Sequence, residues 1–176
     1  MKLDIDPAAE LAAIHGILDE FDRMRGSGPE VMDRRSPEVS GWSVAQHLYH
    51  CALATGLSLR NTSSLVRGKG RLIQEEGELS KEAADVLRSN RTERGQAEAP
   101  RMVTPPDEVD LSFLEMELET NRKDMASLAE QTAAILAAPN WIPHQLLGPL
   151  DAPAWLRFTH LHAKHHLDIA HDILAS

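Results

Sequence analysis

The chain contains very little cysteine and few aromatic residues. Cys51 is its single cysteine, so no disulfide can form within the chain. We expect a small buried residue in a reducing compartment, with a redox role for the lone thiol as the open alternative. Aromatic side chains make up 4% of the 176 residues, whereas strands are usually richer in them. This scarcity, together with abundant Ala, Leu and Glu, favours helices.

An excess of positive charge and long apolar runs are also missing. The net charge is -9, and Lys and Arg do not cluster, which argues against binding to nucleic acid. No apolar run approaches the roughly 20 residues of a membrane span. The first residues, MKLDIDPAAE, lack the apolar segment of a signal peptide. We therefore expect a cytoplasmic protein without membrane contact.

Apolar residues recur at spacings of three and four in four long segments, which predicts four helices in one domain spanning residues 1–176. Asp6 and Pro7 mark the start of the first helix, and Ser43 with Gln46 forms a capping box before the second. Asp151 caps the last one. The expected ranges are 7 to about 26, 44 to about 66, about 110 to 137, and 152 to the end of the chain.

Two connections have a composition of their own. Residues 71–106 are polar and weakly periodic, and we expect a long crossover with one short helix at about 81–89. Residues 140–150 are expected to form a structured turn. The sequence thus predicts an all-α protein, a four-helix bundle with a long crossover between the second and third helices.

Three histidines occupy core positions on two of these helices. His162 and His166 lie one turn apart on the apolar stripe of the last helix, about 6 Å from each other. His47 lies on the core stripe of the second helix. A buried imidazole without a partner is unfavourable, and three inward histidines match a catalytic metal site with one open position. The alternative is a hydrogen-bonded core histidine at each position.

The other histidines differ in their expected roles. His50 and His165 lie beside the three candidate ligands and could orient them. His144, in the turn before the last helix, could overhang the end of the bundle and take part in catalysis. We expect His160 and His171 to point to solvent from the opposite face of the helix.

Several other chemistries are excluded by missing motifs. The chain has no Glu-x-x-His pair of a di-iron bundle, no HExxH motif, no phosphate-binding glycine loop and no nucleophile elbow. A haemerythrin-like site would need a carboxylate where Cys51 stands. What remains is a mononuclear site, and three imidazoles suit zinc, nickel, copper or iron.

Two motifs resemble the DinB/YfiT-like superfamily of metal-dependent helical-bundle proteins. They are Gly41-Trp42-Ser43-Val44-Ala45-Gln46-His47-Leu48 and His162-Ala163-Lys164-His165-His166. The stretch from Pro105 through His144-Gln145-Leu146-Leu147-Gly148-Pro149-Leu150 to Leu167 is similar to one uncharacterised branch. The chain departs from many members at Leu167-Asp168-Ile169, where they have Arg-Gly-Gln.

The resemblance implies a metal site at His47, His162 and His166, holding zinc or nickel, in a protein that is often a homodimer. It also implies a small-molecule substrate, a low-molecular-weight thiol, because known relatives include thiol-dependent transferases and isomerases. The sequence equally permits hydrolysis by activated water. Two alternatives stay open, namely a non-catalytic, stress-related module stabilised by its metal, and a carrier of haem or another ligand.

Overall fold

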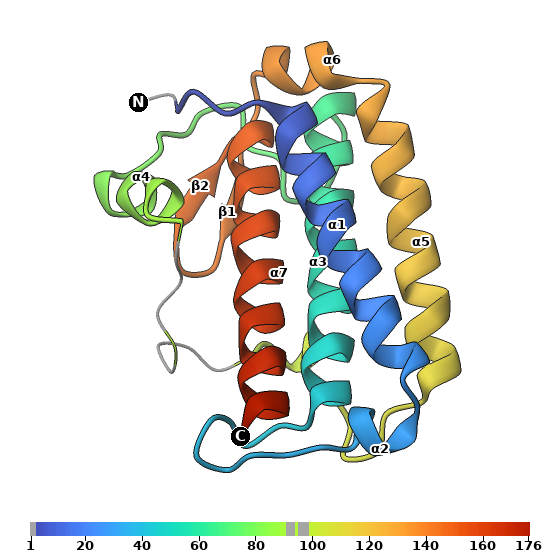
Figure 1. Ribbon diagram of the computed structural model, residues 1–176. Coiled ribbons are helices and arrows are strands. Elements are labelled where there is room, and N and C mark those ends of the chain that lie inside the picture. Colours follow the sequence, from blue (N-terminus) through green and yellow to red (C-terminus); the bar gives the residue numbers. More distant parts are fainter. Residues whose placement is uncertain (1–2, 91–93, 95–98) are drawn as a thin grey trace.

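Four long helices form a bundle in the computed structural model, which describes residues 3–90, 94 and 99–176. They are α1 (Pro7–Gly26), α3 (Val44–Arg67), α5 (Leu111–Ala129) and α7 (Ala152–Ala175) (Figure 1). Both α1 and α3 pack against α5 and α7, so α1 and α3 lie at opposite corners. The predicted all-α bundle, with its long crossover between the second and third long helices, is confirmed.

The remaining elements are short. They are α2 (Pro29–Met32), α4 (Lys81–Arg88), the 3-10 helix η1 (Arg101–Val103), α6 (Thr132–Ala137), β1 (Ile142–His144) and β2 (Gly148–Leu150). The two strands pair antiparallel, with Ile142 opposite Leu150. No helix among the described residues is long and apolar enough to cross a membrane.

The helix starts follow the predicted capping residues. Asp6 accepts a hydrogen bond from the Ala8 N–H, and Asp151 accepts one from Ala154. Ser43 and Gln46 form both halves of the capping box of α3. These side chains satisfy N–H groups that have no partner within the helix, which fixes where each helix begins.

The third helix was predicted as one continuous segment over 110–137, and this is wrong. The helix breaks at Glu130 and Gln131, between α5 and α6. A straight helix would carry Ile135 past the end of the bundle. Instead α6 folds across that end and contacts α1, α3 and α7, with Ile135 fully buried (Figure 1). Burial of this apolar side chain outweighs the continued helix that local propensity favours.

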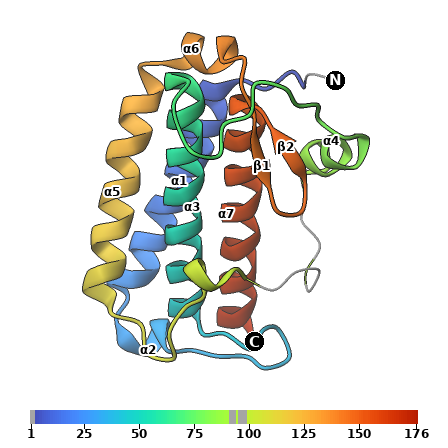
Figure 2. The same ribbon diagram turned by 180° about the vertical axis from the view of Figure 1, so that it is seen from behind.

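The crossover and the hairpin flank the half of the bundle formed by α3 and α7. The hairpin lies beside α7, where the Trp155 indole N–H donates to the Ile142 carbonyl at 3.2 Å. In Figure 2 the yellow-green η1 lies against α3. The residues between α2 and α3 run past the end of α7, and the Arg34 side chain donates to the Ser176 carbonyl there. These segments surround the histidines described next.

Candidate metal centre

The histidines of α3 lie in its first two turns, directly after the capping box. Gln46 ties this end to the crossover, because its amide nitrogen donates to the Pro106 carbonyl at 2.8 Å. His47 and His50 are both buried, 3% and 4% exposed, and both face α7. The capping box therefore fixes where α3 begins, and with it where His47 and His50 lie along the helix.

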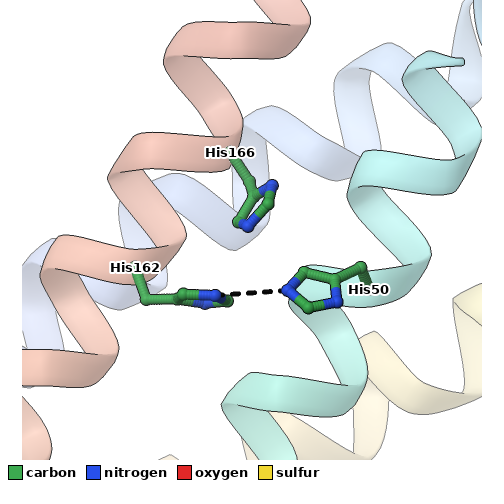
Figure 3. Close-up of side chains that lie close together, drawn as sticks. All are labelled: His50, His162 and His166. Atoms are coloured by element: carbon green, nitrogen blue, oxygen red, sulfur yellow. Dashed lines mark hydrogen bonds between the residues drawn. The ribbon is translucent and has the colours of Figure 1, made fainter. Parts of the chain in front are cut away.

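Three imidazoles form a compact group across the α3–α7 interface. Each of His50, His162 and His166 offers a ring nitrogen, and these nitrogens all lie within 4.8 Å of one another. The Nε2 atoms of His50 and His162 are 3.2 Å apart. Figure 3 shows the three rings converging on one space, with a ring nitrogen of His166 directed at the gap between the other two.

The proton on His50 is assigned by its neighbour. Its Nδ1 lies 2.9 Å from the Val103 carbonyl oxygen, which can only accept a hydrogen bond. Nδ1 therefore carries the hydrogen, and in the neutral ring Nε2 carries a lone pair that faces His162. A backbone carbonyl that binds the second nitrogen of a histidine is the usual support of a metal ligand.

His47 adjoins this group without belonging to it. Its Nδ1 lies 3.0 Å from Nδ1 of His166, and its Nε2 lies 2.8 Å from the Ser40 hydroxyl oxygen. The predicted ligand set was His47, His162 and His166, whereas the close group contains His50 in place of His47. The two predicted residues of α7 thus come together as expected, and the α3 residue whose ring nitrogen lies within 4.8 Å of both is His50, about one turn after His47.

Burial keeps these imidazoles neutral. Desolvation lowers the pKa of His162 and His166 well below the usual value, and the neighbouring histidines lower both further. It also lowers the pKa of His50, while the hydrogen bond to Val103 acts in the opposite direction. The pKa of His47 falls to about 4, mainly through desolvation. Neutral imidazoles present the lone pairs that a metal ion requires.

The other two candidate residues lie at the edges of the group. The His165 ring is 5.1 Å from that of His166, at a right angle to it. His144, in β1, is separated from His162 by Phe158, whose ring centroid is 4.2 Å from His144 and 5.5 Å from His162. His144 lies close enough to affect the pKa of His162 electrostatically.

The histidines on the outer face of α7 are not all solvated. His171 is exposed, as expected. The His160 side chain is only 20% exposed, and its Nδ1 lies 2.6 Å from a carboxylate oxygen of Glu10 on α1, so the expectation of a solvated side chain is wrong. The sequence predicted the face of α7 on which His160 and His171 lie. It did not predict that the Glu10 carboxylate on α1 faces His160.

Aromatic rings enclose the group on two sides. The Trp42 ring lies 5.3 Å from that of His47, 5.2 Å from His50 and 6.4 Å from His166. Phe158 covers the side of His162. A surface cavity of about 560 Å³ lies elsewhere, lined by α3, the residues after it and Ile142 of β1, and none of these histidines lines it. Apolar rings around polar nitrogens reduce the access of water, which strengthens binding to a cation.

The donor set fits a divalent transition metal. Three neutral imidazole nitrogens, one of them oriented by a backbone carbonyl, are typical ligands of zinc, nickel, copper or iron. Two helices supply them, so the group exists only in the folded chain. A fourth ligand from the protein is not among the described residues of this group, which leaves room for a small molecule.

Comparison with known proteins agrees with this fold. The model of the DinB superfamily matches residues 12–170. No curated protein and no solved structure matches the chain significantly. Because the family match covers most of the chain and includes parts or all of the four long helices, with the whole histidine group, the protein belongs to the DinB superfamily.

Proposed function

We propose that this protein is a metal-dependent enzyme whose ion is held by His50, His162 and His166. The observation that carries the proposal is the convergence of three neutral ring nitrogens within 4.8 Å across two helices. A bound zinc or nickel ion would supply a Lewis acid that lowers the pKa of a coordinated water or thiol. The residues of the chain then hold that ion, exclude bulk water and orient the substrate.

The nucleophile is proposed to come from outside the chain. Cys51 lies next to His50 in sequence, but its thiol is fully buried and desolvation raises its pKa to about 12. A thiol in this state is a poor nucleophile. We therefore propose that a low-molecular-weight thiol or water is the attacking group, so that the reaction is thiol S-transfer or hydrolysis.

His144 is proposed to donate a hydrogen bond to the substrate. Its Nδ1 accepts from the backbone N–H groups of Leu146 and Leu147, each at 3.2 Å, so the neutral ring carries its hydrogen on Nε2. Burial lowers its pKa to about 4, which keeps the ring neutral at physiological pH. His165, against His166, is proposed to support the ligand rather than to react.

Homodimer formation, a small-molecule thiol substrate and a cytoplasmic location belong to the same proposal. They are what the resemblance to the DinB superfamily implies, and the family match over residues 12–170 supports that resemblance. The mass of the protein in solution tests the first of them directly.

Metal content provides the decisive test of the site. Protein purified without a histidine tag should contain one zinc or nickel ion per chain, and His162→Ala should lose it. His171→Ala is the matched control, since His171 lies on the same helix but is exposed and outside the group. Metal-free wild-type protein that takes up neither ion would refute the proposal.

The reaction is tested by a substrate screen on the loaded protein. Common cellular thiols should be consumed with an electrophilic acceptor if the protein is an S-transferase, and esters or amides should be cleaved without thiol if it is a hydrolase. Either activity should disappear in His162→Ala and persist in His171→Ala. Activity that is equal in both variants would exclude the histidine group.

A structural role for the metal is the second candidate, because the group joins α3 to α7. An ion shared by two helices binds only the folded state and therefore stabilises it. In a non-catalytic module, chelation should lower the melting temperature by tens of degrees while no substrate is turned over. An enzyme that is folded without metal should lose activity on chelation with a much smaller change in melting temperature.

A further inference from the structure

We propose that His47 is a positioning residue that orders His166 as a metal ligand, and that Ser40 in turn orders His47. This inference rests on the proposed metal site and assigns a role to His47, which lies beside the close group but is not in it. Two contacts carry it, the 3.0 Å approach of His47 Nδ1 to His166 Nδ1 and the 2.8 Å approach of His47 Nε2 to Ser40 Oγ.

The positions of the hydrogens follow once His166 binds metal through Nε2. Its Nδ1 then carries the hydrogen and donates to His47, because a neutral imidazole has one N–H. His47 must accept at Nδ1, so its own hydrogen is on Nε2 and is donated to the Ser40 oxygen. Each contact has a donor and an acceptor, and the chain of hydrogen bonds runs in one direction from the metal ligand to the hydroxyl.

Ser40 is placed to be the end of this chain. Its backbone N–H donates to the Ser36 carbonyl at 2.9 Å, closing a tight turn before α3. Its hydroxyl oxygen also accepts from the Trp42 N–H at 3.2 Å, which uses one of its two lone pairs and leaves the other for His47. The same loop thus supplies the acceptor for His47 and the Trp42 ring that covers His47, His50 and His166.

His47 is poorly suited to be a ligand itself. Both of its nitrogens lie within hydrogen-bond distance of a partner, and neither falls within the group whose nitrogens share a 4.8 Å space. Val103 supports His50 in the same way, since its carbonyl binds the nitrogen that does not face the metal. His50 and His166 therefore each have a hydrogen-bond partner behind the ring, and partners of this kind raise metal affinity by about 10–100-fold.

The test compares zinc affinity, measured by competition with a chelator, in variants of α3. Replacement of His47 by Leu removes the acceptor, and we expect zinc binding to weaken by about 10–100-fold. His47→Asn places an amide oxygen near the position of Nδ1, so it should restore most of the affinity. The same substitution one turn later, His50→Asn, keeps a donor for Val103 but removes the ligand, and it should abolish zinc binding.

X-ray absorption of the zinc-loaded proteins separates a positioning residue from a ligand. Three imidazoles should coordinate zinc in the wild type and in His47→Leu alike. Loss of one imidazole in His47→Leu would overturn the proposal, because His47 would then be a ligand. Unchanged affinity in His47→Leu would also overturn it, since the contact would then have no effect on the metal.

Two controls keep the outcomes distinct. Ser40→Ala leaves all histidines in place and should weaken zinc binding less than His47→Leu does, so it tests the chain of hydrogen bonds even where the Leu variant folds poorly. Wild-type protein without affinity for zinc or nickel would refute the proposed metal site and with it this role. If the wild type binds zinc tightly, and Ser40→Ala and His47→Leu both bind it as tightly as the wild type, the positioning role alone is refuted.

Discussion

The Val103 carbonyl and the His50 ring meet at 2.9 Å, so that a 3-10 turn in the crossover fixes the direction of a candidate metal ligand on α3. The two residues are 53 positions apart in the sequence. Val103 is itself anchored, since its side chain is buried and its N–H donates to the Pro100 carbonyl. The long crossover therefore contributes directly to the geometry of the site.

A first prediction concerns this anchor. Val103→Ala keeps the backbone carbonyl but removes side-chain packing that holds it, and zinc affinity should fall by roughly tenfold, the lower range for loss of such support. Met102→Ala is the control, because Met102 belongs to the same turn but is 70% exposed. Chelator competition measures the zinc affinity of both variants. If Val103→Ala and Met102→Ala bind zinc equally tightly, the turn does not orient His50.

A second prediction concerns the single thiol. Since burial raises the pKa of Cys51 to about 12, a thiol-specific alkylating reagent should modify the protein only after unfolding. Cys51→Ala should retain its metal and any thiol-transfer activity, and it should lose roughly 1 kcal/mol of stability from the removed buried atom. Rapid alkylation of the native protein, measured by mass spectrometry, would contradict this.

The helix boundaries were predictable because capping is local. Asp6, Ser43 with Gln46, and Asp151 act on N–H groups two or three positions away, and the structure contains each of these caps. The break between α5 and α6 was not predictable in this way. Glu130 and Gln131 are good helix formers, and only the end of the bundle, which no local pattern reveals, explains why the chain turns there.

The choice between His47 and His50 shows a similar limit. Residues three apart on a helix lie on the same side of it, but the predicted core stripe contained His47 and left His50 beside it. Which one approaches His162 and His166 depends on how far α3 is shifted along α7. The spacing of residues within one helix contains no information on that shift.

A third prediction concerns pH. Protonated His144 could no longer accept from Leu146 and Leu147, and burial lowers its folded pKa to about 4 from an ordinary value of 6.5. The unfolded chain therefore binds the proton more readily. The stability contributed by neutral His144 is fully present above pH 6.5 and is lost as the pH falls towards 4, by about 3 kcal/mol at most.

This is measured on metal-free protein, by denaturant unfolding at several pH values. His144→Asn can still accept the two backbone hydrogen bonds but does not titrate in this range. Its stability should fall less steeply than that of the wild type between pH 6.5 and 4. Parallel curves for the two proteins would show that His144 takes up its proton as readily in the folded state as in the unfolded chain.

A final prediction uses the contact between Gly56 on α3 and Asn121 on α5. Asn121 is fully buried, and its amide nitrogen donates to the Ala52 carbonyl at 2.8 Å, while its oxygen has no partner among the described residues. A Cβ at Gly56 would lie 2.8 Å from that oxygen. Within a helix, Gly→Ala usually stabilises by about 1 kcal/mol, but here we expect a loss of roughly 1–3 kcal/mol from overpacking.

Gly16 on α1 provides the control, since a Cβ there would meet nothing within 4 Å. Gly16→Ala should stabilise the protein, and Gly56→Ala should destabilise it in equilibrium unfolding. In an Asn121→Ala background the clash is gone, so Gly56→Ala should become neutral or stabilising, and the double-mutant cycle then gives the coupling between the two positions. Equal effects of Gly56→Ala in both backgrounds would show that Asn121 does not restrict this position.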